Sequence, residues 1–237
     1  KGQCCPSPKH IMAPTRNYNN TLFSTAIDAV LKTSWGPPTW RPHTLLRRRG
    51  DPAVLFTSLI KSYFDRGQAS HALNVFDEMP AKDVVSWTAM ISGYASRGDH
   101  RHAWRTFIDM FHAGRRPNEY TLSSVLKACK GMGIVSCGGL VHGLAVKLGL
   151  RGLIYVDNGL VDMYASCCLS MKNACAIFRE IQKKNEVSWT TLISGYTHKG
   201  RAERALQFYR EMMLDEEVEG ANPFTFSIVI RACASMG

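Results

Sequence analysis

The side chains most able to do covalent or metal chemistry in this sequence are eight cysteines and eight histidines. The cysteines are Cys4, Cys5, Cys129, Cys137, Cys167, Cys168, Cys175 and Cys233. None has C-x-x-C spacing, and the adjacent pair at 167 and 168 projects in different directions from a helix, so it cannot easily share a tetrahedral metal. We expect that pair to be small buried apolar side chains in a turn. No phosphate-binding loop, nucleophile elbow or H-E-x-x-H motif is present either. The sequence therefore predicts a non-enzymatic segment with no cofactor, no metal site and no small-molecule substrate.

The overall composition favours a soluble, ordered protein in a reducing compartment. The formal charge is +10, but residues 1–50 carry eight basic side chains against one acid, so the remaining residues hold only +3. No secretory signal begins the chain, which favours free thiols over disulfides. No run of 18 apolar residues occurs, so we expect no membrane span. The first residue is Lys and the last segment stops within its pattern, so a fragment of a longer chain is expected.

The elements that would position any functional side chain are amphipathic helices that recur. The stretch VVSWTAMISGYASRG at 84–98 returns at 186–200 as EVSWTTLISGYTHKG. Large apolar side chains fall at i, i+3, i+4 and i+7 in both copies, which places them on one helical stripe. They are Trp87, Met90, Ile91 and Tyr94, and then Trp189, Leu192, Ile193 and Tyr196. One helix cannot bury such a stripe alone, so the repetition predicts stacked units.

The same template divides the rest of the chain into helix-turn-helix units. We expect the first to pair a helix over 53–67 with one over 70–80, with Gly67 as a left-handed cap between them. The units are 53–83, 84–118, 119–153, 154–185, 186–222 and a partial unit 223–237. Equivalent positions recur 102 residues apart, from Thr88 to Thr190. Units that bury their apolar faces only against neighbours form an all-α solenoid, and we expect the first helices to line its concave side.

These units resemble those of plant pentatricopeptide repeat (PPR) proteins of the PLS class, in which P, L and S repeats alternate. The match rests on VVSWTAMISGYASRG, NVFDEMPAKD, YVDNGLVDMYASC and TLSSVLKACKGMG, and it covers 53–237. The resemblance assigns S to 53–83, P to 84–118, L to 119–153, S to 154–185, P to 186–222 and partial L to 223–237. It also implies a right-handed superhelix. The tetratricopeptide pattern, W-x2-L-G-x2-Y, is the nearest alternative and fits less well.

The resemblance implies sequence-specific binding of single-stranded RNA, one base per unit. In the family, the fifth and last residues of a unit contact the base edge, and the second residue packs on base faces. The implied pairs are Thr57 with Asp83, Thr88 with Asn118, Asn158 with Asn185, and Thr190 with Asn222. The implied second residues are Val54, Val85, Tyr155 and Val187. The family's code reads them as G-A-N-Y-A from 5′ to 3′, because Ser123 and Leu153 form no usable pair.

A structural role is the alternative for each of these side chains. Thr or Asn at a helix start is often only an N-cap that binds a free backbone N–H. Extra residues around 167–169 and 215–219 make the last residues of two units less certain than the fifth residues. We expect Trp87 and Trp189 to be inter-helix core, not stacking platforms. Thr88 and Thr190, each directly after a tryptophan, are expected to point from the core into the groove.

The resemblance further implies the site-recognition part of a C-to-U RNA editing factor that acts on organelle transcripts. PLS proteins often end in a zinc deaminase-like domain, whose signature pairs H-x-E with C-x-x-C. No histidine here is followed two places later by Glu. An α-solenoid scaffold that holds a peptide, and a factor that stabilises or splices RNA, are the alternatives. The expected partners are single-stranded RNA and other editing-complex proteins, with no membrane.

The amino-terminal residues 1–52 are interpreted as a basic leader and linker. Residues 21–33 have one apolar helical face, which fits a capping helix or the amphipathic part of a transit peptide equally well. The run Arg47-Arg48-Arg49 is read as part of a solvated linker, with a phosphate contact as the alternative. The acid-poor leader and the family resemblance predict a mitochondrial protein, with the chloroplast as the alternative.

Overall fold

A computed structural model describes residues 52–218 and 220–236 of the chain. These residues form eleven α-helices and no strand. The interpretations of the leader, of the helix over 21–33 and of the arginine run lie outside the described residues. The helices are α3 (Pro52–Asp65), α4 (Ala69–Asp77), α5 (Val84–Ser96), α6 (His100–His112), α7 (Glu119–Met132), α8 (Val135–Lys147), α9 (Ile154–Cys167), α10 (Lys172–Glu180), α11 (Glu186–His198), α12 (Ala202–Met213) and α13 (Pro223–Ala234).

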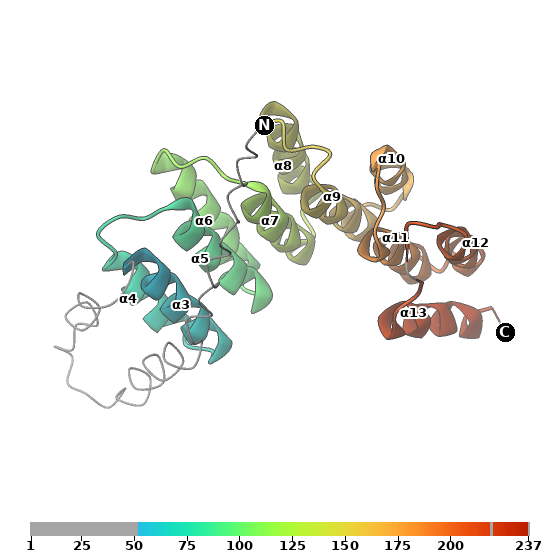
Figure 1. The fold of residues 1–237 in the computed structure, drawn as a ribbon, viewed down its shortest axis with the longest axis horizontal. Helices are drawn as coiled ribbons and strands as arrows, with labels where there is room; N and C mark the ends of the chain where they lie inside the picture. The colour runs from blue at the N-terminus through green and yellow to red at the C-terminus, as the bar shows by residue number, and fades with distance from the viewer. Residues whose placement is uncertain (1–51, 219, 237) are drawn as a thin grey trace, which may run out of the picture. The chain divides into compact units, whose positions relative to one another are not determined.

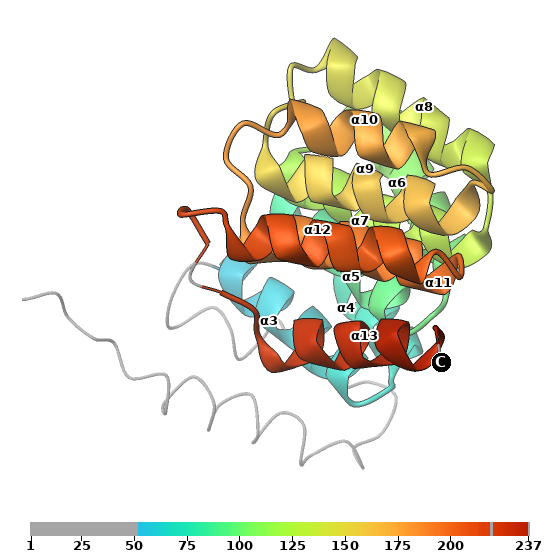
Figure 2. The same cartoon turned by 90° about the vertical axis from the view of Figure 1, so that its right-hand side faces the viewer.

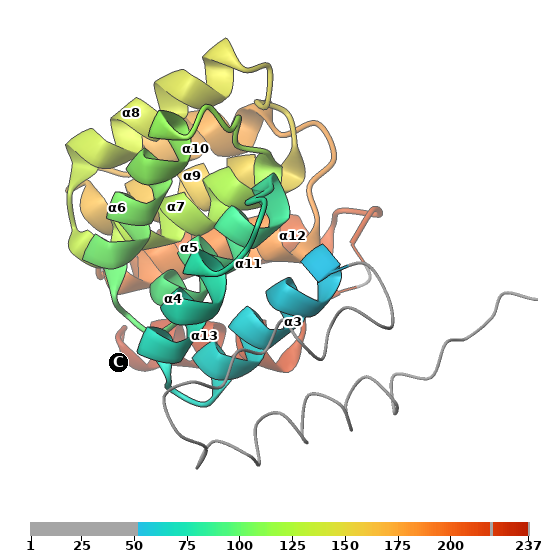
Figure 3. The same cartoon turned by 90° about the vertical axis from the view of Figure 1, so that its left-hand side faces the viewer.

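The helices are arranged in two rows that follow the chain. The first helices of successive units pack directly on one another, α3 on α5, then α7, α9, α11 and α13. Each first helix from α3 to α11 also packs on the second helix of its own unit, as α5 does on α6 and α11 on α12. Figure 1 shows α5, α7, α9 and α11 as one row with α6, α8 and α10 to one side. Seen from the α13 end in Figure 2 and from the α3 end in Figure 3, the helices lie in stacked layers. Within the described residues the chain is an α-solenoid.

The repeated apolar stripe forms the core between the helices. The side chains at Trp87, Met90, Ile91 and Tyr94 are buried, and so are their counterparts at Trp189, Leu192, Ile193 and Tyr196. Each tryptophan meets a phenylalanine of the preceding unit edge to face, with ring centroids 4.7 Å apart for Phe76–Trp87 and 4.9 Å for Phe178–Trp189. This is a favoured geometry for aromatic pairs. Both tryptophans therefore hold adjacent units together.

A glycine in the repeated S-G-Y sequence lets neighbouring first helices approach closely. A Cβ atom at Gly93 would overlap atoms of the Phe64 ring, and one at Gly195 would meet Cβ of Ala165 at 2.7 Å. Another glycine, Gly67, follows the end of α3. Its φ of 83° is one that L residues rarely adopt, so glycine suits this left-handed position. The predicted left-handed cap at this position is confirmed.

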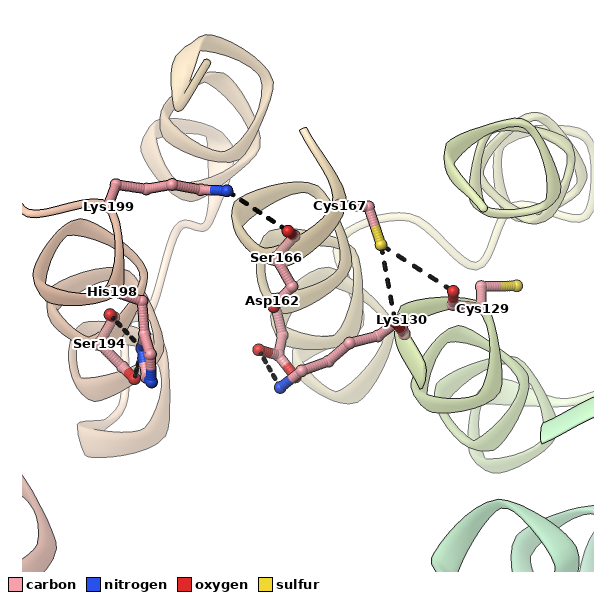
Figure 4. A network of polar contacts seen from close by, with 8 residues as sticks. All are labelled: Cys129, Lys130, Asp162, Ser166, Cys167, Ser194, His198 and Lys199. Carbon is pink, nitrogen blue, oxygen red and sulfur yellow. Dashed lines mark hydrogen bonds and ion pairs between the residues drawn. The ribbon is translucent and has the colours of Figure 1, made fainter. Parts of the chain in front are cut away.

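At three junctions, a side chain from the following unit contacts backbone carbonyls where a first helix ends. Arg97 Nη1 donates to the Phe64 carbonyl at 3.1 Å, and Lys199 Nζ donates to the Ser166 carbonyl at 3.4 Å. Cys167 takes this place between α7 and α9, where its Sγ lies 3.8–3.9 Å from the carbonyls of Cys129 and Lys130 (Figure 4). A cation stabilises the negative end of a helix more than a thiol does. The expectation of buried thiols was only partly right, because Cys167 and Cys168 are half-buried.

Candidate nucleic-acid interface

The last residue of four units is the N-cap of the first helix of the next unit. Oδ1 of Asp83, Asn118, Asn185 and Asn222 each accepts a backbone N–H three residues later, at 2.8–3.0 Å. The capping alternative considered for helix-start residues therefore describes these four side chains. The cap uses Oδ1, which is one of the two terminal atoms of each side chain. Among the described residues, the amide nitrogen of Asn118 and of Asn222 has no hydrogen-bond acceptor, so these N–H groups remain available to a ligand.

The fifth residues approach the last residues in three of the four implied pairs. Asn158 Nδ2 donates directly to Asn185 Oδ1 at 3.3 Å. Thr88 and Thr190 reach their partners through one intervening hydroxyl, that of Thr121 and Thr225 respectively. The fourth pair is not joined, because the Thr57 hydroxyl donates to the Ala53 carbonyl at 2.9 Å.

The two threonines that follow the repeated tryptophans differ in exposure. Thr88 is half-buried, as expected for a side chain at a groove, but Thr190 is only 6% exposed. The expectation that Thr190 points from the core into the groove is therefore met only in part, because its side chain is buried. Its hydroxyl is held 2.7 Å from that of Thr225, on the neighbouring helix α13, which covers it. Thr190 nevertheless lines a cavity between α11 and α13.

The second residues of the units form a row of exposed apolar side chains. Val54, Val85, Tyr155 and Val187 are between 54% and 59% exposed, although most other apolar residues of their helices are buried. Sequence reasoning missed two further members, Tyr120 at 52% and Phe224 at 65% exposure. Both occupy the second position of their units, so the repeat register itself could have found them. The rings of Tyr120 and Tyr155 lie side by side with centroids 5.3 Å apart. Exposed apolar and aromatic faces at regular spacing suit the packing of planar bases.

Two cavities bring the second, fifth and last residues together. A cavity of about 290 Å³ is lined by Val187, Thr190 and Asn222, together with Phe224, the second residue of the next unit. A larger one of about 530 Å³ has the same arrangement one unit earlier, with Tyr155, Asn158, Asn185 and Val187. Each cavity is thus lined by the second residues of two successive units and by hydrogen-bonding side chains. Oδ1 of Asn158 is buried and has no partner in the protein, which leaves it free to accept from a ligand.

The free atoms predict which base edges would fit. An asparagine whose Oδ1 caps a helix offers only N–H donors, which suit the acceptor ring nitrogen of adenine or cytosine. Asp83 caps in the same way but leaves a carboxylate oxygen, an acceptor that suits the ring N–H of guanine or uracil. Because the cap uses one side-chain oxygen, the remaining atom decides whether the last residue offers a ligand a hydrogen-bond donor or an acceptor. The fifth residue, short in Thr and longer in Asn, would then distinguish large purines from small pyrimidines.

Lysines supply charge beside these cavities. Lys127 Nζ donates to Ser96 Oγ at 3.1 Å, and Lys130 forms a 2.8 Å ion pair with Asp162 (Figure 4). All four residues line the larger cavity. Basic groups beside these two cavities suit a phosphate backbone, although the ion pair partly offsets one charge.

Two of the thiols lie in surroundings that lower their reactivity. Burial raises the pKa of the Cys129 thiol to about 12 and also raises that of Cys167, so both are protonated and poorly nucleophilic at neutral pH. No group of three His, Cys, Asp or Glu side chains within 52–218 and 220–236 is placed to hold a metal ion. In the same residues, no helix is both long and apolar enough to cross a membrane.

A buried ion pair that the sequence did not reveal lies where unit 119–153 meets unit 154–185. Arg151 Nε is 3.0 Å from Oδ1 of the buried Asp157, and Arg151 also binds Glu180 and His142. Burial raises the pKa of Asp157, and Arg151 opposes that effect. Burial and then the charge of Arg151 lower the pKa of His142. The four residues span 142–180 and share no motif, so only the packing of α8, α9 and α10 brings them together.

Helix pairs that stack in chain order, each packed mainly on its neighbours, define the class of helical-repeat proteins. Within that class, the model of the PPR repeat family matches residues 82–131 and 184–235, and that of the PPR repeat matches 54–84. The chain belongs to the PPR repeat family.

Curated relatives carry the same repeat name. A putative pentatricopeptide repeat-containing protein of Arabidopsis thaliana is 50% identical over 183 residues, 77% of this chain and 30% of its own length. A mitochondrial member from the same plant is 35% identical over 78% of this chain and 29% of its own. A chloroplastic one is 35% identical over 77% of this chain and 20% of its own. The chain thus spans less than a third of the length of these relatives.

Solved structures share the fold. The pentatricopeptide repeat protein PPR10 in complex with an 18-nucleotide psaJ RNA element matches with a TM-score of 0.60 at 17% identity, over 78% of this chain and 28% of that one. Nuclear proteinaceous RNase P 2 from Arabidopsis thaliana matches with a TM-score of 0.54 at 14% identity, over 77% and 42%. At these identities the likeness concerns the helical array alone.

Proposed function

We propose that this chain binds single-stranded RNA sequence-specifically, with one base held between the second residues of two successive units. The observation that carries the proposal is the repeated grouping of second, fifth and last residues around a cavity, seen at Thr190 with Asn222 and at Asn158 with Asn185. The PPR10 complex with RNA supports the choice of ligand. The residues proposed to contact RNA are Thr57, Asp83, Thr88, Asn118, Asn158, Asn185, Thr190, Asn222, Val54, Val85, Tyr155 and Val187, to which the geometry adds Tyr120 and Phe224.

The proposed target contains G-A-N-Y-A from 5′ to 3′, in an organelle transcript. The free N–H groups of Asn118 and Asn222 favour adenine at the second and fifth bases, beside Thr88 and Thr190. Mitochondrial and chloroplastic relatives support an organelle, and we place the chain in the mitochondrion first and the plastid second. The alternating unit lengths support membership of the PLS class. We further propose, as the resemblance to the PLS class implies, that the chain presents a site for C-to-U editing by a deaminase elsewhere.

The test is competition binding by fluorescence anisotropy between two oligonucleotides. One contains G-A-C-C-A, and its partner has both adenines changed to guanine. We expect tighter binding to the first, and affinity for both to fall as salt is raised, since phosphate contacts release counterions. Equal affinity for the two at physiological salt would refute base reading. Binding of an extended peptide without salt-sensitive RNA binding would instead make the chain a protein scaffold.

A further inference from the structure

Two buried threonines connect the proposed base-reading side chains of units 84–118 and 186–222. Thr121 and Thr225 are the third residues of the units that follow, and both are fully buried. The hydroxyl of Thr121 lies 2.7 Å from that of Thr88 and 2.8 Å from Asn118 Oδ1. The hydroxyl of Thr225 lies 2.7 Å from that of Thr190 and 3.1 Å from Asn222 Oδ1. Neither buried threonine can touch RNA, but each contacts both members of a pair.

The hydrogen positions in this chain of bonds follow from counting protons. A carboxamide oxygen only accepts, so the single hydroxyl proton of Thr121 must go to Asn118 Oδ1. The 2.7 Å bond between the two threonines then requires Thr88 to donate its own proton to Thr121. Thr88 is left with lone pairs alone towards the groove. The same count makes Thr190 an acceptor through Thr225.

The resulting pair presents one acceptor and one donor in a fixed order. Thr88 Oγ1 can accept from the exocyclic amino group of adenine, while Asn118 Nδ2 donates to its ring nitrogen. Guanine places a carbonyl oxygen and a ring N–H at these two positions, so both contacts become repulsive. If the Thr88 proton could turn into the groove, it would donate to that carbonyl and weaken the discrimination.

The third residue does not make this connection in the other two pairs. Ser188 donates to Asn185 Oδ1 at 2.9 Å, but Asn158 binds the same oxygen directly through Nδ2. Ser86 donates to the backbone carbonyl of Asp83, and Thr57 bonds within its own helix. The three-residue connection therefore occurs only beside the two pairs proposed to read adenine.

We propose that Thr121 and Thr225 are positioning residues that set the base preference of the preceding unit. By taking the hydroxyl proton of Thr88 and Thr190, they make these residues acceptors and so favour adenine over guanine. This inference rests on the proposed function, since it concerns how a bound base is chosen. The proposal adds a third residue, from the following unit, to the fifth and last residues that are proposed to contact the base.

Valine at position 121 is the decisive variant, because it has nearly the volume of threonine and lacks the hydroxyl. Thr121→Val keeps the backbone cap of Asn118 Oδ1 but leaves Thr88 free to rotate its proton. Thr121→Ser restores the hydroxyl and should restore the preference. Ser188→Ala is the matched control, because it removes a capping hydroxyl at the equivalent position where no connection to the fifth residue depends on it.

The experiment measures the ratio of affinities for adenine and guanine at each of two bases. Oligonucleotides with a single change at the second or the fifth base of G-A-C-C-A are titrated against the whole chain and its variants. We expect Thr121→Val to lower the ratio at the second base about fivefold, the effect of one net hydrogen bond, and to leave the fifth unchanged. Thr225→Val should do the reverse. Thr121→Ser and Ser188→Ala should preserve both ratios.

The outcomes separate this inference from the proposed function. If the unmodified chain shows no preference for adenine, the proposed function fails. If it prefers adenine and both valine variants keep that preference, the positioning role is refuted while the function stands. Thermal unfolding identifies a variant that has lost its fold. Because α7 and α13 are separate helices, Thr225→Val then still tests the role if Thr121→Val cannot fold.

Discussion

The side-chain amide of Asn158 donates to Oδ1 of Asn185 across 3.3 Å, although 27 residues separate them. Asn185 Oδ1 also caps α11 by accepting from the backbone of Ser188. Oδ1 of Asn185 therefore caps the first helix of the next unit and also orients Asn158, its partner in the pair proposed to read a pyrimidine. Structure and recognition are coupled through the same side chain, so variants must be chosen to change one and keep the other.

Asn185→Asp should change the preferred pyrimidine without weakening the fold. Aspartate caps a helix about as well as asparagine, so the midpoint of thermal unfolding should hardly move. The group offered to the base changes from an N–H donor to an oxygen acceptor, which suits the ring N–H of uracil. We expect the preference at the fourth base to move from cytosine to uracil in competition binding. A retained cytosine preference with normal folding would show that Asn185 does not contact the base.

Asn118→Ser and Asn118→Ala should separate capping from reading. Serine keeps the cap but lacks the amide, whereas alanine lacks both. We expect Asn118→Ala to lower the free energy of unfolding by about 1 kcal/mol and Asn118→Ser to change it by a few tenths at most. Both should lose the adenine preference at the second base. Chemical denaturation and anisotropy measured on the same samples check the two effects, and a preference that survives in the serine variant would contradict the assignment.

The two repeated tryptophans should respond differently to replacement by phenylalanine. Trp189 Nε1 donates to Asp215 at 2.9 Å, while the buried Nε1 of Trp87 has no acceptor. Trp189→Phe should therefore cost about 1.5–3 kcal/mol more than Trp87→Phe, the contribution of a hydrogen bond to a charged group. Asp215→Ala should remove this difference. Equal losses measured by urea unfolding would mean that Asp215 does not stabilise the indole.

The stability that His142 contributes to the array should fall as the pH is lowered from about 7 to 5. Burial and then Arg151 lower the pKa of His142 below its usual 6.5, so the folded protein resists protonation that the unfolded chain accepts. The stability that this residue contributes is present above pH 6.5 and is lost as the pH falls towards its folded pKa. His142→Gln should flatten the dependence of the unfolding free energy on pH in that window.

The helical array could be predicted from the sequence because its signals are local and repeated. The stripe of Trp87, Met90, Ile91 and Tyr94 specifies a buried face, and its return a hundred residues later specifies stacking. The capping function of Asn118 was visible only as an alternative, because capping depends on backbone geometry at one residue. The exposed row would have been complete had the register been applied to Tyr120 and Phe224.

Side-chain connections between units could not be predicted, since no local pattern encodes them. The hydroxyl of Thr121 joins two side chains from the preceding unit, and Arg151 meets Asp157 and Glu180 only after three helices pack. The burial of Thr190 depends in the same way on α13 covering it. Spacing shows which residues share a helix face, whereas proton positions and exposure require the neighbouring helix.

The most direct test of base reading is to change both members of one pair and follow one base. In Thr88→Asn with Asn118→Asp, the longer fifth residue suits a pyrimidine, and the acceptor at the last position suits a ring N–H. We expect affinities for oligonucleotides carrying each of the four bases at the second position to shift their maximum from adenine to uracil, with the other bases read as before. An unchanged preference for adenine in a folded double variant would contradict the account.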